Sequence, residues 1–190
     1  MKTSLRIVVG ILGLVAIFFG VKQIIRGTKE LSGQPVTQTQ KLGETYTSTE
    51  NGYSHRFPQG WEQKPPPQSG VTMIAAPKAS GFASNMVTTF EQFEGTLRAY
   101  VDANIKSLQS NVPDAKLVSD TEFVPDNKAQ SYKLKLQNKM NNIDLAQTMY
   151  FFDGKQGRKI IVTCTATAKQ GPELEPLFDD CMKTFALTGQ

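Results

Sequence analysis

The sequence predicts an α+β domain, an antiparallel sheet of about six to seven strands with two main packing helices, preceded by one N-terminal transmembrane helix. Three observations lead to this prediction. An unbroken apolar run occupies 7–21, two later segments have the apolar spacing of amphipathic helices, and much of the remaining chain alternates apolar and polar residues. At 190 residues, the chain is long enough for one ordinary hydrophobic core.

The net charge of +4 is concentrated at the N-terminus. Four of the 21 basic residues lie in 1–26, which contains no acid, so 17 basic and 17 acidic residues remain in the rest of the chain. The folded part is therefore formally neutral. Because it has no basic face to contact phosphates, we expect no nucleic-acid partner.

The first expected element is a membrane anchor at 1–26, with residues 7–25 in the bilayer. At 1.5 Å per residue, these roughly 19 residues nearly span a hydrocarbon core of ~30 Å. Lys22 lies near one end, where its ammonium group can reach the interface. A cleaved signal peptide is the alternative, but no pair of small residues at the usual spacing follows the run. We expect an uncleaved anchor.

Residues 27–49 are rich in Gly, Ser, Thr and Gln, which predicts a flexible tether before the domain at 50–190. Positive charges flank both ends of the apolar run, so the charge bias hardly indicates an orientation. A short tail before a long polar domain usually leaves the tail in the cytoplasm. We therefore expect the domain on the periplasmic or extracytoplasmic side of a single-pass protein.

The domain is expected to open with a half-buried strand in Gly52–Trp61. Tyr53, His55 and Phe57 alternate with polar residues, and a Pro-x-Gly turn leads into Trp61, the only tryptophan of the chain. Tyr53, Phe57 and Trp61 are thus candidate contacts for a ligand or partner. The alternative is that these aromatic residues belong to the core, where aromatic side chains contribute much of the packing.

The positions of proline and glycine and the spacing of apolar residues assign the segments that follow. Glu62–Gly70 contains three successive prolines and is expected to be a loop, while Val71–Ala75 and Met86–Phe93 are short apolar runs typical of strands. Thr96–Ser110 has apolar residues on one helical face, as does Gly171–Phe185. Pro172 and Pro176 are expected in the first turn of the second helix or just before it.

Between the two helices the chain predicts an antiparallel meander. Ala129–Gln137 alternates Tyr132, Leu134 and Leu136 with lysines, which is the strongest strand signal in the sequence. Short turns separate it from Ile143–Phe152 and Arg158–Ala166, and parallel neighbours would need longer crossovers. Lys116–Val124 is expected to be a further strand.

Catalytic and metal-binding patterns are missing from the sequence. His55 is the only histidine, so a triad or a multi-histidine metal site would depend on it alone. The carboxylates of Asp153, Asp179 and Asp180 match no calcium loop, and no glycine-rich phosphate motif occurs. We expect no enzyme activity and no cofactor, with a hydrolase as a minor alternative.

The two cysteines are candidates for a structural disulfide. Cys164 shares a strand face with Ile160 and Val162, and Cys181 lies on the apolar stripe of the following helix. A bridge would close a short loop and stabilise the domain by about 3 kcal/mol in a chain-entropy model. Two reduced, buried thiols are the alternative. An oxidising compartment favours the disulfide.

The order of these elements resembles the PsbP-like superfamily, the fold of an extrinsic photosystem subunit and of a Ran-binding nuclear import factor. Within it, the chain looks most like DcrB-type bacterial envelope proteins. The resemblance covers about Glu50–Leu187 and includes the Phe57-Pro58 to Gly60-Trp61 turn, the meander and the closing helix. It implies an antiparallel sheet with packed helices and an accessory or binding role without established catalysis.

These observations predict a membrane-anchored, non-enzymatic accessory module that contacts an unidentified envelope protein. The alternative is a carrier or sensor of a small apolar ligand, bound in a cleft near the opening strand.

Overall fold

The computed structural model describes residues 41–65, 70–77 and 82–189. In chain order the elements are β1 (Leu42–Ser48), β2 (Tyr53–Pro58), β3 (Glu62–Lys64), β4 (Thr72–Ala75), β5 (Asn85–Gln92), α2 (Leu97–Asn111), β6 (Lys116–Phe123), β7 (Ser131–Met140), β8 (Ile143–Asp153), β9 (Arg158–Thr167), α3 (Gly171–Lys183) and β10 (Ala186–Leu187).

The strands form two antiparallel sheets instead of one. The large sheet has seven strands in the order β3-β4-β5-β9-β8-β7-β6, and the small sheet has three in the order β1-β2-β10. The predicted α+β class, the antiparallel pairing and the two packing helices are confirmed. The meander is confirmed as well, because β7 pairs with β8 and β8 with β9.

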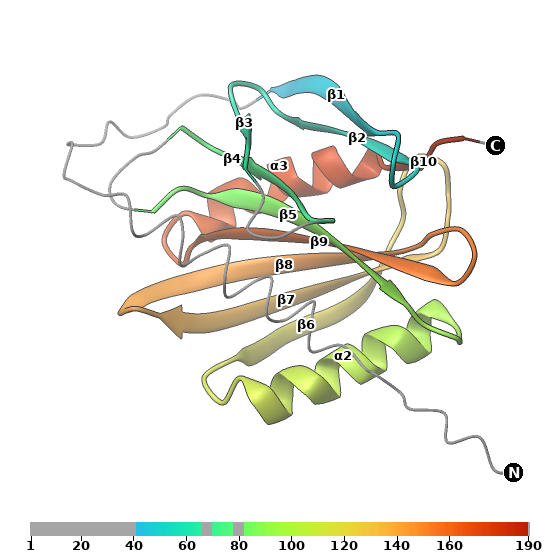
Figure 1. The fold of residues 1–190 in the computed structure, drawn as a ribbon. Coiled ribbons are helices and arrows are strands. Elements are labelled where there is room, and N and C mark those ends of the chain that lie inside the picture. The colour runs from blue at the N-terminus through green and yellow to red at the C-terminus, as the bar shows by residue number, and fades with distance from the viewer. Residues whose placement is uncertain (1–40, 66–69, 78–81, 190) are drawn as a thin grey trace, which may run out of the picture.

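The two helices cover opposite faces of the large sheet (Figure 1). α3 contacts β8 and β9 on one side and β2 on the other, so it lies between the two sheets. α2 contacts β7 and β8 from the opposite face. The core is therefore divided into two main clusters, one around α3 and the small sheet and one beneath α2.

Local sequence explains where the helices begin and end. The side chain of Thr96 accepts a hydrogen bond from the Ala99 amide and caps α2, and Pro113 follows its end. α3 begins at Gly171, with Pro172 in its first turn. Pro176, however, lies inside α3, beyond the first turn in which the sequence analysis expected it.

Two loop predictions need correction. The expected tether at 27–49 includes β1, because Leu42–Ser48 pairs with β2 and so belongs to the domain. Threonines, a tyrosine and a serine in this segment suit an edge strand despite their polarity. The expected loop at Glu62–Gly70 begins with β3, whose three residues pair with β4 before the prolines.

The expected anchor at 1–26 and the tether as far as residue 40 lie outside the described residues. Within the described residues, no helix is both long enough and apolar enough to cross a bilayer.

Candidate functional site

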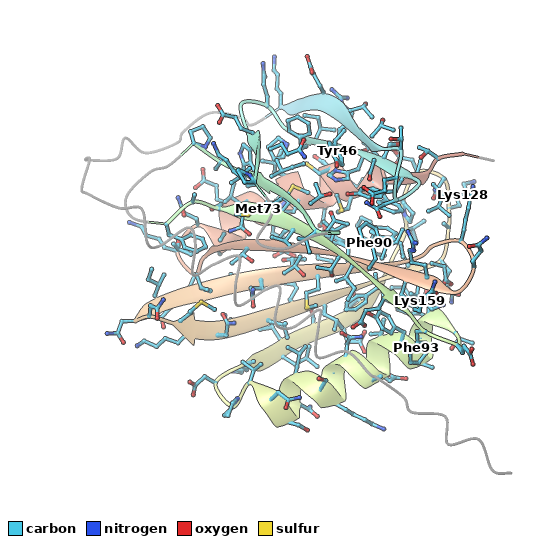
Figure 2. All side chains as sticks on the ribbon, in the orientation of Figure 1. Tyr46, Met73, Phe90, Phe93, Lys128 and Lys159 are labelled. Carbon is cyan, nitrogen blue, oxygen red and sulfur yellow. The ribbon has the colours of Figure 1, made fainter. Side chains whose placement is uncertain are left out.

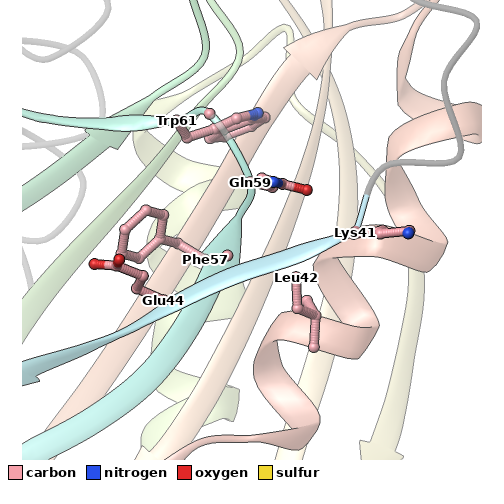
Figure 3. A pocket seen from close by; sticks show the side chains of 8 residues that line it. Lys41, Leu42, Glu44, Phe57, Gln59 and Trp61 are labelled. Carbon is pink, nitrogen blue, oxygen red and sulfur yellow. The ribbon is translucent and has the colours of Figure 1, made fainter.

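The candidate site is a surface pocket of about 450 Å³ at the start of β1 and the turn after β2 (Figure 3). Its apolar walls come from Leu42, Phe57 and Trp61, and charged groups come from Lys41 and Glu44. The remaining lining residues are Gly43, Gln59 and Gly60.

The pocket is shaped by the close approach of β1 to the end of β2. The amide of Gln59 donates to the carbonyl oxygen of Lys41 at 2.8 Å, which fixes the start of β1 against the turn. A Cβ on Gly43 would lie 3.0 Å from the carbonyl oxygen of Phe57 and 3.2 Å from the Cα of Gln59. Gly43 therefore permits the close approach of β1 to the end of β2, because the side chain of a larger residue would push the two segments apart.

Trp61 contributes to both the core and the pocket. The turn places it by a hydrogen bond from its amide to the carbonyl oxygen of Pro58, and Gly60 adopts a positive φ of 80°. The indole packs edge-on against Phe178 with ring centroids 5.9 Å apart, and only 5% of the residue is exposed. Trp61 is thus a rigid wall of the pocket, anchored by α3.

Of the three aromatic residues expected at a site, the structure brings Phe57 and Trp61 together at the pocket but not Tyr53. Tyr53 is fully buried and stacks on Phe185 at 5.8 Å between ring centroids. Burial raises its pKa to about 12. The core alternative therefore describes Tyr53, whereas Phe57 is only half-buried.

His55 lies in a buried aromatic cluster beside the pocket. Its ring stacks on Tyr53 at 5.9 Å and lies 6.0 Å from Tyr46, which Figure 2 labels on the small sheet. Its Nδ1 lies 2.9 Å from the carbonyl oxygen of Arg56, so Nδ1 carries the proton and donates, while Nε2 has no partner. Burial lowers the pKa of His55, which keeps the ring neutral. No acid or nucleophile hydrogen-bonds this ring among the described residues, so it has no partner for a triad.

The two cysteines are free and buried in the same core cluster. The expected disulfide between Cys164 and Cys181 is not present in this structure. The packing on which it was based is present, because α3 does pack on the strand face that contains Ile160 and Val162. Burial raises the pKa of the Cys164 thiol well above its ordinary value and that of Cys181 to about 12. Both thiols are therefore poor nucleophiles in the folded protein.

A charged cluster that the sequence did not predict lies between α3 and the large sheet. The ammonium group of Lys133 donates to Glu175 at 2.9 Å and to Asp179 at 2.7 Å. The Tyr150 hydroxyl also donates to Asp179 at 2.7 Å, and Lys135 pairs with Glu175 at the same distance. The available signal in the sequence was the spacing of Glu175 and Asp179, which lie at i and i+4 of the closing helix and so share one helical face.

This charged cluster stabilises the ionised forms of Lys133 and Glu175. Burial alone would favour the neutral amine of Lys133, but its hydrogen bonds to Asp179 and Glu175 outweigh this and raise its pKa. Burial alone would raise the pKa of Glu175, yet the hydrogen bonds from Lys133 and Lys135 lower it. The cluster is fully paired, which suits a structural role more than proton transfer. Among the described residues, no group of three or more His, Cys, Asp or Glu side chains could hold a metal ion.

The comparisons with known proteins identify the fold of this chain but no family. No family model and no curated protein matches the chain. Among solved structures, cyanobacterial PsbP from Synechocystis is 15% identical with a TM-score of 0.55, and the match covers 83% of this chain and 98% of that one. LpqN of Mycobacterium tuberculosis, described as involved in cell envelope biogenesis, is 12% identical with a TM-score of 0.58, covering 80% and 93%.

The Ran-binding protein Mog1p of Saccharomyces cerevisiae is 6% identical with a TM-score of 0.59, and the match covers 78% of this chain and 96% of that one. At these identities the likeness concerns the fold. This chain therefore shares the PsbP-like fold that its element order suggested.

Proposed function

We propose that this chain is a membrane-anchored, exported accessory module that binds an envelope protein through the pocket at β1 and β2 and performs no catalysis. The observation that supports this is the composition of the pocket, in which Phe57 and Trp61 form apolar walls beside the charged groups of Lys41 and Glu44. A pocket with apolar walls and a polar rim can receive an apolar anchoring side chain of a partner protein.

The location rests on the apolar run at residues 7–25. LpqN, which shares the fold, is described as acting in envelope biogenesis, and this agrees with the proposed setting. The nearer likeness to DcrB-type envelope proteins rests on the element order in the sequence.

Site-specific photocrosslinking in native membranes tests this function. A benzophenone amino acid replaces Glu44 at the pocket, and the matched control places it at Gln109, an exposed position on α2 across the large sheet. We expect a discrete crosslink to another envelope protein from position 44 and none from position 109. Crosslinks only between copies of this chain, or identical products from both positions, would contradict the proposal.

The second candidate function, a carrier of a small apolar ligand, is favoured by the size of the pocket. Its volume lies within the roughly 300–1,000 Å³ that is usual for small-molecule sites. Since Trp61 is the only tryptophan and lines the pocket, its fluorescence reports occupancy directly. If the module binds proteins, titration with palmitate leaves the emission unchanged. A saturable spectral shift that Phe57→Ser removes would instead establish the carrier.

A further inference from the structure

The free edges of the two sheets differ in how they are protected against pairing with another strand. β6 carries Lys116, Asp120 and Glu122 and has an irregular register, and these features discourage strand addition. The edge strands β3 and β10 have only three and two residues. β1 differs, because Thr45–Ser48 is regular, uncharged and free of proline. It pairs with β2 alone among the described strands.

The direction of the main-chain groups on β1 follows from the hydrogen bonds of β2. The Arg56 amide in β2 donates to the Thr184 hydroxyl, and just before β2 the carbonyl oxygen of Gly52 accepts from the Thr188 amide. The even-numbered residues of β2, Ser54 and Arg56, therefore direct their main-chain groups toward β10. Alternate residues point to the opposite edge, so His55 directs its groups toward its partner Tyr46. On β1, Thr45 and Thr47 consequently direct their N–H and C=O groups outward.

The unprotected part of β1 adjoins the candidate pocket. Its preceding residues, Leu42 to Glu44, line the pocket, and the Arg56 guanidinium occupies the carbonyl oxygens of Leu42 and Gly43 at 3.1 and 2.9 Å. Within the part of the chain that the structure describes, main-chain groups of β1 without a partner therefore begin at Thr45, directly after the pocket. A strand added there would carry alternate side chains toward the apolar walls at Phe57 and Trp61.

We propose that β1 accepts an extended segment of a partner protein as an added strand along Thr45–Ser48, with one large apolar side chain of that segment in the Phe57–Trp61 pocket. This inference rests on the protein-binding function proposed above and specifies its mode. The main chain supplies affinity for any extended segment, and the pocket supplies selectivity for the anchoring side chain.

Displayed random dodecapeptides, selected against the purified full chain, provide the probe. We expect selected peptides to share a large apolar residue within a β-branched context, and their binding to slow hydrogen exchange at the Thr45 and Thr47 amides. Thr47→Pro removes an outward amide without breaking a bond to β2 and should weaken binding about tenfold or more. Thr47→Val keeps the amide and should bind within about twofold of the original chain.

The melting temperature of Thr47→Pro provides the control for folding, and a value within a few degrees of the original shows that the fold is intact. If Thr47→Pro fails to fold, exchange at the Thr45 and Thr47 amides in the original chain decides the result. A library without binders, peptides that leave these amides unprotected, or equal binding by a folded Thr47→Pro would overturn the inference. A concentration-dependent dimer that Thr47→Pro abolishes would also overturn it, because the strand added to β1 would then come from a second copy of this chain and not from a partner protein.

The two proposals fail separately. If photocrosslinking from position 44 still captures the envelope partner in the Thr47→Pro background, the binding function stands and strand addition is wrong. If position 44 captures no other protein in the original chain, the function itself is wrong.

Discussion

Lys133 on β7 donates to both carboxylate oxygens of Asp179 on α3, at 2.7 and 2.8 Å. This pair joins the closing helix to the sixth strand in the order of the large sheet, across 46 positions of sequence. The Tyr150 hydroxyl donates to the same carboxylate from β8. Asp179 is therefore the central acceptor of the interface between α3 and the large sheet.

Replacing this carboxylate should destabilise the domain. Asp179→Asn leaves the largely buried ammonium group of Lys133 with fewer acceptors and should lower the free energy of unfolding by about 1–3 kcal/mol. The matched control is Asp180→Asn, which breaks an exposed pair with Lys183 and should cost less than about 1 kcal/mol. Urea unfolding of both variants provides the measurement. Equal losses of unfolding free energy in the two variants would show that the Lys133–Asp179 pair stabilises the domain no more than the exposed pair does.

His55 should make stability depend on pH near the ordinary pKa of histidine, the only side-chain type whose ordinary pKa lies between about pH 5 and 8. Because burial lowers its folded pKa below the ordinary value of 6.5, its contribution is complete above pH 6.5 and is lost as the pH falls toward the folded pKa. The free energy of unfolding should decrease by up to about 1.4 kcal/mol per pH unit below 6.5.

Chemical denaturation between pH 7.5 and 5 measures this loss, with His55→Gln as the comparison. As His55 is the only histidine, the variant should show a nearly flat profile over the same range. An unchanged pH dependence in His55→Gln would assign the proton uptake to another group.

The docking of α3 on β8 should not tolerate a side chain at Gly171. A Cβ there would lie 2.5 Å from the Cβ of Ala146, so Gly171→Ala must displace the start of the helix and should cost about 1–3 kcal/mol. The double variant Gly171→Ala/Ala146→Gly removes the clash and should recover much of the loss. Thermal unfolding of the single and double variants tests this, and additive losses would show that the two positions do not clash.

The cysteines should be silent toward thiol reagents in the folded protein. Cys164 and Cys181 are buried with raised pKa values, so an aromatic disulfide reagent at pH 8 should react with neither until the reduced protein is unfolded, when it should count both. Reaction in the folded state would contradict the burial of these thiols. The same count on unfolded protein isolated from membranes without reductant tests the disulfide expected from the sequence, and two thiols would exclude it.

The proposed topology predicts which side of the membrane carries the domain. If the proposed topology holds, protease added to cells whose outer layer has been permeabilised should digest the domain on the periplasmic or extracytoplasmic side. A cytoplasmic marker enzyme in the same cells serves as the control and should stay intact. Protection of the domain together with the marker would place it in the cytoplasm.

Local pattern was a good guide to the large sheet. The alternation of Tyr132, Leu134 and Leu136 predicted β7, and these residues do face the α2 side of the sheet. Lys133, which alternates with these residues, lies on the other face of β7 and is covered by α3. Alternation identifies the apolar face of a strand, but it cannot show that a second layer, which brings its own acids, covers the polar face.

The candidate site was predicted in part. The strand-and-turn pattern of Gly52–Trp61 singled out Phe57 and Trp61, both of which line the pocket. It could not separate them from Tyr53, because all three are aromatic residues in one short stretch. Tyr53 and Phe57 differ in their position along β2. Tyr53 lies under Phe185 in the core, whereas Phe57 lies at the end of the strand that lines the pocket, beside the start of β1.

Periodicity, proline and glycine in the sequence were sufficient to establish the α+β class, both helices and the meander, because these features depend on neighbours within a few residues. The division into two sheets and the pairing of Lys133 with Asp179 depend on contacts between residues far apart in the chain. Such contacts form only when α3 packs between the two sheets, and the pocket takes its shape only when the start of β1 lies against the turn after β2.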